Sequence, residues 1–282
     1  MELWFTEKHT TGAGLVLKCK KTVYSAQSPF QQIDVLETEE FGRMLLLDGL
    51  VMTTERDEFI YHEMLVHPPM HIHGNARNVL VVGGGDGGAV RELLRYPCIE
   101  HVTLCEIDKE VVETAKRFFP TLSYKLEDPK VEIVYQDGST LLKKSKNCFD
   151  LIVIDSTDPI GAAKTLFTRE FYSACKKALV NKGIVCAQSE SPIYHIEIIK
   201  DMISNIKAAQ FDSVRPYTAP IPTYPGGFWS WMVACISGHC SDNEIPSTLP
   251  ADQYAKLKYF NLDILKAAFC LPNFLKRALD KS

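Results

Sequence analysis

Acidic side chains follow four strand-like apolar runs of this chain, each at the point where the run ends. In an open parallel sheet, ligands bind beyond the carboxyl ends of the strands. If the four runs are parallel strands of one sheet, their acids meet at one edge and surround one ligand. These acids are Asp86 in the glycine loop GGGDGG, Glu106, Asp137 before Gly138, and the pair Asp155 and Asp158 in DSTDP.

The glycine loop at residues 83–88, directly after a strand-like run, indicates a site for a nucleotide-like ligand. Glycines let the backbone approach the ligand, and the following helix presents its positive N-terminus to it. Glu106 lies about 20 residues after the loop, where a carboxylate can accept hydrogen bonds from both ribose hydroxyls. These two features fit NAD, FAD and S-adenosylmethionine (AdoMet) equally well.

Asp86 in the middle of the loop favours a cationic ligand. The pyrophosphate of a dinucleotide or the carboxylate of AdoMet would meet a like charge there, at a cost of about 1 kcal/mol in water-like surroundings and more when desolvated. Decarboxylated AdoMet instead carries a sulfonium and an aminopropyl tail that ends in a cationic amine. The alternative is that Asp86 points away from the ligand and caps the helix that follows.

The pair Asp155 and Asp158 predicts chemistry on an amine. A primary amine is protonated near neutral pH, with a reference pKa of about 10.4 for lysine, and must lose a proton before it can attack carbon. Two carboxylates three residues apart can hold the cations of a diamine, and one of them can accept that proton. Asp155 ends its strand and has the more fixed position, so we predict that it is the general base and that Asp158 anchors the amine.

Some of these acids also have a purely structural interpretation. Asp137 before Gly138 could form a turn or cap a helix, and Asp158 before Pro159 could shape a turn. The chemical interpretation rests on finding all of them at the ends of strands in one sheet.

The elements before residue 74 read as a small antiparallel β domain. Two apolar runs flank Asp48-Gly49, which predicts a tight β-hairpin. A short helix follows, and we expect it to stop at Pro68-Pro69. The strand-like runs cover residues 14–27, 31–39 and 42–55.

From residue 77 the chain alternates between strand-like and helical stretches, which predicts a parallel sheet covered on both faces. We expect an α/β fold with two domains, residues 1–73 and 74–282, and a boundary within residues 71–77. The strand-like runs are residues 78–82, 101–107, 131–136, 149–155, 183–188 and 229–236.

Composition excludes several classes of protein. The net charge of −4 over 282 residues leaves no basic footprint for nucleic acid and no polybasic membrane patch. No stretch approaches the roughly 20 apolar residues that span a bilayer, and the N-terminus lacks an apolar signal core, so we predict a cytoplasmic protein. The nine cysteines are scattered through apolar segments, which favours reduced thiols over a disulfide framework.

No metal site is predicted. The chain has no CxxC, and Cys235, His239 and Cys240 form only a weak cluster. His62 and His67 nearly match the zinc-binding helix motif, but they are five residues apart and lie roughly 140° from each other on a helix.

The motifs GGGDGG, CEID, YQDG and DSTDPIG, with DGLVMTTERDEFIYHEM before them and IPTYPGG after, resemble the spermidine synthases, which are polyamine aminopropyltransferases. The likeness runs from WFTEK to KAAFCLPNFL, nearly the whole chain. It implies a small N-terminal β domain and a Rossmann-like, methyltransferase-type parallel sheet, commonly assembled as homodimers or homotetramers. It also implies transfer of an aminopropyl group from decarboxylated AdoMet to putrescine, giving spermidine and methylthioadenosine without a metal.

The resemblance also implies roles for individual residues. Asp86 would bind the aminopropyl ammonium, Asp155 would be the general base, and Tyr224 would form a wall of the diamine slot. Residues on the nucleoside side are Gln31, Asp86, Glu106, Asp137 and Gly138. Residues on the amine side are Tyr61, His62, Asp86, Asp155, Ser156, Thr157, Asp158 and Tyr224.

Two departures from the family pattern stand out. Ala162 replaces a proline of the common DPIGP, in a stretch, residues 156–166, that we expect to close over the site as a lid. Trp229 and Trp231 are bulkier than the small or aliphatic residues expected after YPGG, either as core residues or as a change at the far end of the slot.

Other functions remain open at this point. The same fold would suit an amine N-methyltransferase that uses intact AdoMet, against which Asp86 argues. A non-catalytic binding module would lack the paired acids, and an NAD-dependent oxidoreductase would leave DSTDP unexplained. The acceptor could also be cadaverine, agmatine or spermidine.

Overall fold

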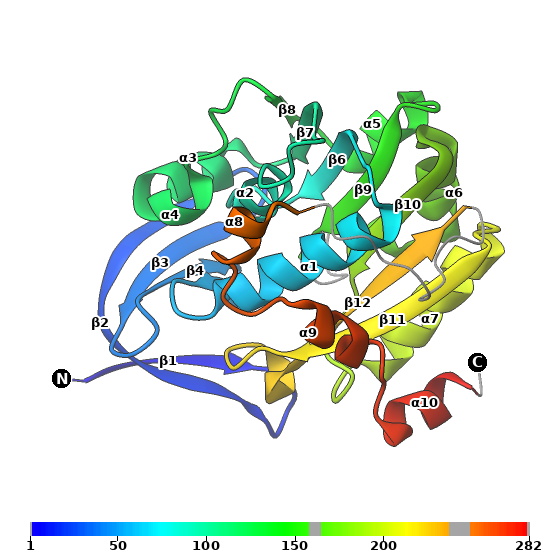
Figure 1. Cartoon of the computed structure of the whole chain (residues 1–282). Helices are drawn as coiled ribbons and strands as arrows, with labels where there is room; N and C mark the ends of the chain where they lie inside the picture. Colours follow the sequence, from blue (N-terminus) through cyan, green and yellow to red (C-terminus); the bar gives the residue numbers. More distant parts are fainter. Residues whose placement is uncertain (1, 158–164, 237–248, 281–282) are drawn as a thin grey trace.

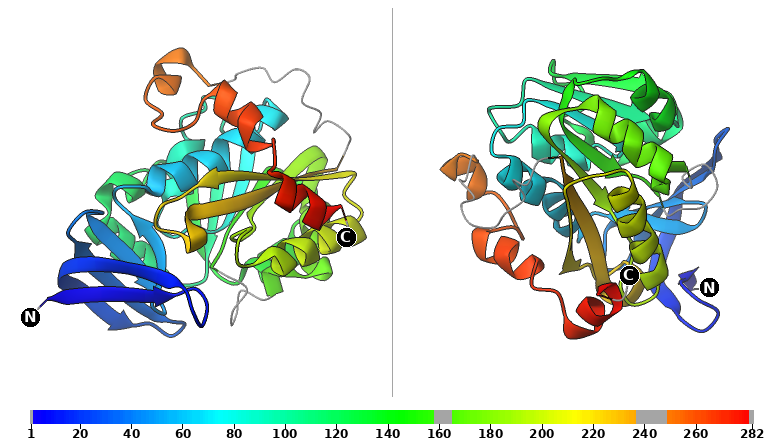
Figure 2. Two further views of the ribbon diagram at one scale, coloured as in Figure 1. Left: turned by 90° about the horizontal axis from the view of Figure 1, so that it is seen from below. Right: turned by 90° about the vertical axis from the view of Figure 1, so that its right-hand side faces the viewer.

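The computed structural model describes residues 2–157, 165–236 and 249–280 and contains two sheets (Figure 1). The N-terminal sheet, drawn in blue, lies at one end of the molecule, and the larger sheet with its helices forms the rest (Figures 1 and 2). In the described residues, no helix has both the length and the apolar character needed to cross a membrane.

The N-terminal sheet is antiparallel with the order β1-β2-β3-β4-β5. Asp48 and Gly49 have φ of 50° and 79° and close the β4–β5 hairpin, because the tightest hairpin turns need two positive φ angles. The small antiparallel β domain and its hairpin are therefore confirmed, and β1 is an additional strand. The strands are β1 Leu3–Lys8, β2 Gly14–Gln27, β3 Gln32–Thr38, β4 Arg43–Leu47 and β5 Leu50–Thr54.

The second sheet has the order β11-β12-β10-β9-β6-β7-β8. Its five strands β6 to β10 are parallel, as expected, while β12 runs antiparallel to β10 and β11 antiparallel to β12. Strand β11 was not predicted. It contains Pro216, and an edge strand such as this one is a place in a sheet where proline is tolerated. The strands are β6 Asn78–Gly83, β7 His101–Glu106, β8 Val131–Tyr135, β9 Phe149–Asp155, β10 Leu179–Gln188, β11 Ser213–Pro220 and β12 Phe228–Cys235.

Helices cover both faces of this sheet, because alternate strand residues are apolar on both sides. Val79 and Val81 pack toward α1 and α2, while Leu80 and Val82 pack toward α5, α6 and α7. The short helices α8 to α10 follow the last strand, and Figure 2 shows them along the outside of the molecule. The helices other than α1 are α2 Gly88–Leu93, α3 Lys109–Phe118, α4 Pro120–Ser123, α5 Gly138–Lys144, α6 Arg169–Ala178, α7 Ile196–Ala208, α8 Ala251–Tyr254, α9 Leu262–Ala268 and α10 Asn273–Leu279.

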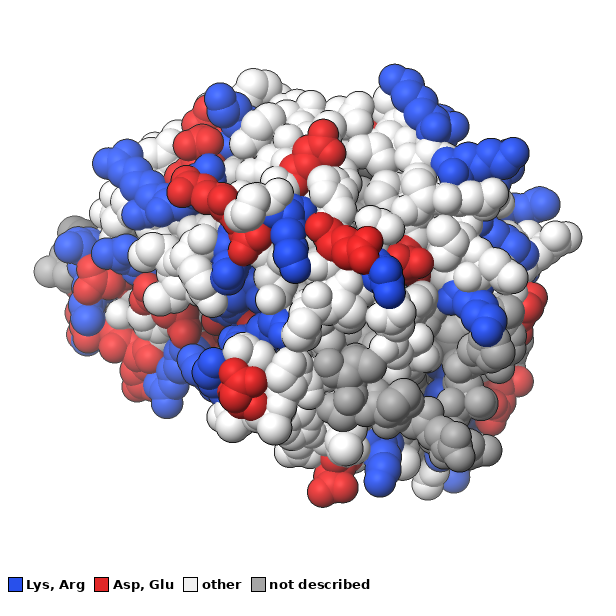
Figure 3. Space-filling view, turned by 45° about the horizontal axis from the view of Figure 1, so that its top comes forward, with Lys and Arg blue, Asp and Glu red and all other residues white. Residues whose placement is uncertain are grey.

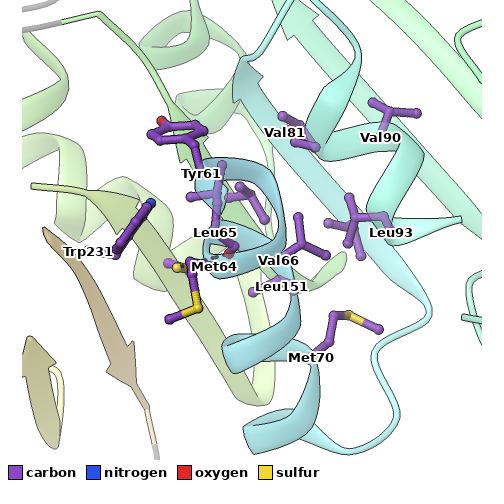
Figure 4. Packing of buried hydrophobic residues seen from close by; sticks show 14 of the residues in the cluster. Tyr61, Met64, Leu65, Val66, Met70, Val81, Val90, Leu93, Leu151 and Trp231 are labelled. Carbon is purple, nitrogen blue, oxygen red and sulfur yellow. Dashed lines mark hydrogen bonds between the residues drawn. The ribbon is translucent and has the colours of Figure 1, made fainter. Parts of the chain in front are cut away.

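Helix α1, Glu58–His73, packs against α2 and β10 of the second sheet. Figure 4 shows Met64, Leu65 and Val66 of α1 among apolar side chains of neighbouring elements. Residues of α1 are thus part of the core of the second sheet, although they precede residue 74. The division into domains 1–73 and 74–282 stays a prediction.

The expected stop at Pro68-Pro69 is wrong, because α1 continues to Gly74, whose φ of 80° ends it. Proline has no N–H, so two prolines in a helix deprive the carbonyl groups four residues earlier of their donors. Both carbonyls find other donors here: the Tyr217 hydroxyl lies 2.8 Å from the Met64 oxygen, and the Cys186 thiol lies 3.4 Å from the Leu65 oxygen. Partners distant in the sequence therefore allow the helix to continue.

The cysteines only partly match the expectation of reduced thiols. Seven of the described cysteines are free, and Cys148 and Cys270 among them are exposed. Cys235 is disulfide-bonded, so the expectation of reduced thiols in place of a disulfide framework does not hold for this cysteine. Disulfides are rare in cytoplasmic proteins, so this disulfide does not support the predicted location. The cytoplasmic location stays a prediction.

Charged side chains of both signs share the surface. Figure 3 shows one face on which Lys and Arg lie among Asp and Glu. The expectation that the protein does not bind nucleic acid stays a prediction.

Replacing Tyr217 tests how the helix continues past its prolines. Tyr217→Phe removes the donor to the Met64 carbonyl, which is buried, and should lower the free energy of unfolding by about 1–3 kcal/mol in urea denaturation. Tyr259→Phe is the matched control, since the Tyr259 side chain is half-buried and its hydroxyl has no hydrogen bond among the described residues. Equal unfolding midpoints for the two variants would contradict this account of α1.

Candidate active site

A cavity of about 480 Å³ lies where the four predicted strand ends meet the N-terminal sheet. Its floor comes from the ends of β6 to β9, and Gln31, Leu47 and Met52 of the N-terminal sheet and its loops close the opposite side. The predicted site residues that line it are Gln31, Tyr61, Asp86, Glu106, Asp137, Gly138, Asp155, Ser156, Thr157 and Tyr224. The structure thus brings these residues together around one space, while their individual roles stay predictions.

Three predicted features of the site are not among the residues that line this cavity. His62 does not line the cavity but lies behind Asp86. Asp158 and Ala162 lie outside the described residues, as does most of the stretch 156–166 that was expected to act as a lid.

The glycines at the start of the loop make room for Asp155 on the neighbouring strand. Gly83 and Gly84 have φ of 79° and 69°, which other residues adopt only with strain. A Cβ atom on Gly83 would lie 2.2 Å from the Asp155 carbonyl oxygen, and one on Gly84 would lie 2.8 Å from its carboxylate. The Gly84 N–H donates to the same carbonyl oxygen at 2.9 Å. The glycine loop thus packs closely against the end of the strand that carries the predicted base, Asp155.

Asp86 both caps α2 and faces the cavity, so its two alternative interpretations are compatible. One carboxylate oxygen accepts the Gly88 N–H at 2.8 Å, and the other lies 3.3 Å from Nε2 of His62. Burial raises the pKa of Asp86, but the His62 ring and the Gly88 N–H outweigh burial and leave the pKa below its usual value. Asp86 is therefore a carboxylate held in its ionised form.

Asp155 has a different environment, although it lies next to Asp86. Its carboxylate accepts a hydrogen bond of 2.6 Å from the Tyr61 hydroxyl. Burial, and then the negative charge of Asp86, raise the pKa of Asp155 to about 6. Of the two neighbouring carboxylates, Asp155 is thus the one that can take up a proton near neutral pH.

Donor atoms of His62, Asp86 and Asp155 lie within 4.8 Å of one another, close enough for a metal ion. Both ring nitrogens of His62 already face carboxylates, however: Nε2 faces Asp86, and Nδ1 lies 2.7 Å from Glu58. The predicted absence of a metal stays a prediction.

Glu106 and Asp108 organise the other end of the cavity. Glu106 is buried and accepts the Asp108 N–H at 2.9 Å, and burial raises its pKa to about 7. The Asp108 carboxylate accepts hydrogen bonds from Gln31 at 2.9 Å and from Ser28 at 2.6 Å. Because Ser28 and Gln31 precede β3 of the N-terminal sheet, these contacts tie the two sheets together beside the cavity.

Asp137 and Gly138 follow β8 at the same end of the cavity. Asp137 caps α5, accepting hydrogen bonds from the Thr140 N–H at 2.7 Å and from the Thr140 hydroxyl at 2.9 Å. A Cβ on Gly138 would lie 2.5 Å from Val82, so close packing explains this glycine. The structural interpretation of Asp137 is thus true, and the residue still lines the cavity.

Aromatic side chains form the wall near Asp155. Tyr224 donates to the Met52 carbonyl at 2.5 Å, and its ring centre lies 5.5 Å from that of Tyr61. Trp229 packs edge-on against Tyr224, and Trp231 packs against Tyr61, both buried. The tryptophans therefore lie in the core behind this wall and do not line the cavity.

Sequence reasoning missed a further acid at this edge of the sheet. Glu190 follows β10, is fully buried and has a φ of 78°. One carboxylate oxygen lies 3.0 Å from His195, and the other has no hydrogen bond within the described ranges. The rule that identified the other acids, an acid just after a strand, also applies to SES directly after GIVCAQ.

Comparisons with known proteins agree with this arrangement. Residues 58–242 match the family model "Spermine/spermidine synthase domain", and residues 3–55 match "Spermidine synthase tetramerisation domain". The chain is 46% identical to the polyamine aminopropyltransferase of Alkaliphilus metalliredigens, with 99% of both chains aligned. It is 44% identical to that of Bacillus subtilis, with 97% of this chain and 98% of the relative aligned.

Solved structures of spermidine synthases resemble the structure of this chain over almost its whole length. A spermidine synthase in complex with the transition state analogue AdoDATO superposes with a TM-score of 0.91 at 40% identity, covering 99% of this chain and 96% of that chain. The spermidine synthase from Thermotoga maritima superposes with a TM-score of 0.89 at 40% identity, covering 99% and 95%. The Rossmann-like fold with its N-terminal antiparallel sheet is thereby confirmed. On this evidence the chain belongs to the spermine/spermidine synthase family and is a polyamine aminopropyltransferase.

Proposed function

We propose that this aminopropyltransferase uses decarboxylated AdoMet as the donor and putrescine as the acceptor, and that it releases spermidine and methylthioadenosine. The observation that carries the proposal is the pair Asp86 and Asp155. These carboxylates lie side by side on one cavity and have pKa values shifted in opposite directions. A permanently charged carboxylate suits binding of an ammonium, and a carboxylate with a raised pKa suits proton transfer.

In this proposal the ligands follow the two ends of the cavity. The adenosine lies toward Gln31, Glu106, Asp137 and Gly138, with its ribose hydroxyls on Glu106. The aminopropyl ammonium binds Asp86, which His62 supports from behind. The diamine lies along the aromatic wall of Tyr61 and Tyr224, near Asp155, Ser156 and Thr157, and Asp158 of the same segment is proposed as a further ligand.

The reaction is a displacement at the carbon beside the sulfonium. An amine nitrogen of putrescine passes a proton to Asp155 and attacks this carbon. The new C–N bond forms as the C–S bond breaks, and the bonding electrons remain on sulfur, which leaves as the neutral thioether methylthioadenosine. The protein contributes mainly by holding nucleophile and carbon in line and by removing the proton.

An amine N-methyltransferase would need intact AdoMet, whose carboxylate would approach the ionised Asp86. Other acceptors, such as cadaverine, agmatine and spermidine, share the nucleophilic amine and differ only in length and end group. Incubation with decarboxylated AdoMet and a panel of these amines, read by mass spectrometry, ranks them. A product larger than the acceptor by a methyl group would contradict the proposed transfer.

Asp155→Asn tests the general base. The amide keeps the shape but cannot accept the proton, so kcat should fall by about 10²–10⁴-fold while decarboxylated AdoMet still binds. In the wild type, kcat/KM should fall as the pH drops through about 6, because Asp155, with its raised pKa, is then protonated. The residual activity of the variant should lack the part of this fall that Asp155 causes, while Glu106, whose pKa is raised to about 7, titrates in both enzymes. A variant with near-normal turnover would remove Asp155 from this role.

Asp86→Asn tests recognition of the donor. The wild type should bind decarboxylated AdoMet much more tightly than AdoMet, and the variant should lose about 1.5–3 kcal/mol of that preference, the size of a hydrogen bond to a charged group. Calorimetry with both ligands measures it. Glu106→Gln is the control, since the ribose is common to both ligands and both affinities should fall together. An unchanged preference in Asp86→Asn would show that another group discriminates.

We also propose that the chain assembles as a homotetramer through the N-terminal sheet. Strand β1 is an edge strand, and Trp4 and Val16 expose 52% and 54% of their surface on one face of the β1–β2 pair. Trp4→Glu combined with Val16→Glu should give smaller species in sedimentation equilibrium. Tyr124→Glu, which changes an exposed aromatic residue outside this sheet, should not. A wild-type monomer at micromolar concentration would contradict the proposal.

A further inference from the structure

A buried chain of charges lies behind Asp86, outside the cavity that holds the ligands. It consists of His62 and Glu58 on α1 and Arg91 on α2, which are 2%, 7% and 7% exposed. None of them touches the cavity. Burying charges is costly unless each is paired, so the arrangement calls for an explanation.

The geometry determines the protonation state of His62. Its Nδ1 lies 2.7 Å from a Glu58 oxygen, and its Nε2 lies 3.3 Å from an Asp86 oxygen. A neutral imidazole can donate from only one nitrogen, so a carboxylate on each side favours the form in which both nitrogens carry a proton. Although burial lowers the pKa of His62, Asp86 and Glu58 outweigh it and raise the pKa well above its usual value.

Arg91 completes the chain and balances its charge. Its two terminal nitrogens bind the two oxygens of Glu58 at 2.9 and 2.8 Å, a bidentate pair with a defined orientation. Its Nε binds Glu92 at 2.7 Å, which anchors the guanidinium on its own helix. Asp86, His62, Glu58 and Arg91 therefore alternate in sign. Asp155 and Tyr61 face the same group from the cavity side.

Gly88 provides the space for the His62 ring. A Cβ at this position would lie 2.3–2.5 Å from three atoms of the ring. The N–H of Gly88 also binds the second oxygen of Asp86. Both oxygens of the Asp86 carboxylate are therefore held from behind, one by Gly88 and one by His62.

We propose that Glu58 and Arg91 are positioning residues for the transfer reaction: they hold His62 as a cation with both ring nitrogens protonated, and His62 in turn fixes the carboxylate of Asp86 toward the ammonium of the donor. Without the charge of Glu58, only Asp86 favours the cation, so the ring loses its second proton at a lower pH and its orientation toward Asp86 is less fixed. The inference rests on the proposed donor only for its kinetic consequence, because the state of His62 is a property of the free enzyme.

The first measurement is nitrogen NMR of His62 in the ligand-free enzyme, assigned by loss of its signals in His62→Gln. In the wild type both ring nitrogens should be protonated at pH 8. In Glu58→Gln the ring should lose its second proton at a lower pH than in the wild type, because Asp86 alone then favours the cation. A His62 titration in Glu58→Gln that is unchanged from the wild type would overturn the role of Glu58, whatever the donor.

The second measurement is steady-state kinetics. Glu58→Gln should raise the KM for decarboxylated AdoMet roughly tenfold at pH 8, the equivalent of about 1.4 kcal/mol, with a smaller change in kcat and partial recovery toward pH 6. Arg91→Met should act in the same direction, and Arg91→Lys should recover only part of the effect, because lysine cannot form the bidentate pair.

Glu63→Gln is the matched control. Glu63 lies on the same helix and is equally buried, but its carboxylate binds the backbone N–H groups of Lys258, Tyr259 and Phe260. This variant should lose stability without changing the state of His62 or the KM for the donor. If the KM of Glu63→Gln rose as much as that of Glu58→Gln, the rise would be a consequence of general destabilisation. This result would overturn the inference.

Gly88→Ala keeps every charge but fills the space of the ring, so it should also raise the KM for the donor. Gly12→Ala, where a Cβ meets nothing within 4 Å, is its control. The outcomes also separate this inference from the proposed function. If His62 behaves as expected while decarboxylated AdoMet binds no better than AdoMet, the donor is wrong and the positioning of His62 stands.

Discussion

The structure depends on one constraint: α1 is largely buried, so its charged side chains need partners inside the protein. Leaving a buried charge unpaired is costly. Asp57, just before the helix, binds Thr223 and so anchors the segment that carries Tyr224. Glu58 binds Arg91, and Glu63 binds the segment after residue 257. Much of the tertiary structure around the cavity is thus arranged by the need to satisfy one helix.

The same constraint gives two neighbouring carboxylates different properties. Asp86 and Asp155 follow adjacent strands and share the cavity, yet the pKa of the first is lowered and that of the second is raised. The difference comes from what lies behind each of them. Asp86 has a histidine cation and a backbone N–H, while Asp155 has a neutral tyrosine hydroxyl and the charge of Asp86 in front of it. One helix supplies both Tyr61 and His62, in consecutive positions.

Much of this could be predicted from the sequence, because strand ends and glycine loops are local signals. The alternation of strands and helices placed Asp86, Glu106, Asp137 and Asp155 correctly at one edge of the sheet. The misses were long-range. The helix runs past Pro68 and Pro69 because Tyr217 and Cys186 supply donors from more than 100 residues away. His62 was expected in the wall of the site. Its partner Glu58 lies one turn away on the same helix, but its contact with Asp86 becomes visible only when α1 is packed on the glycine loop.

The hydrogen bonds of the buried Glu63 carboxylate limit how far the chain can be shortened from its C-terminal end. Its partners are three backbone N–H groups of residues 258–260, and it is 2% exposed. A protein cut before residue 258 would lose these three donors and, with them, Phe260, Leu265 and Ala268, which pack in the same core cluster as α1. A compact version of this enzyme therefore has to keep this segment or replace both its backbone donors and its apolar contacts.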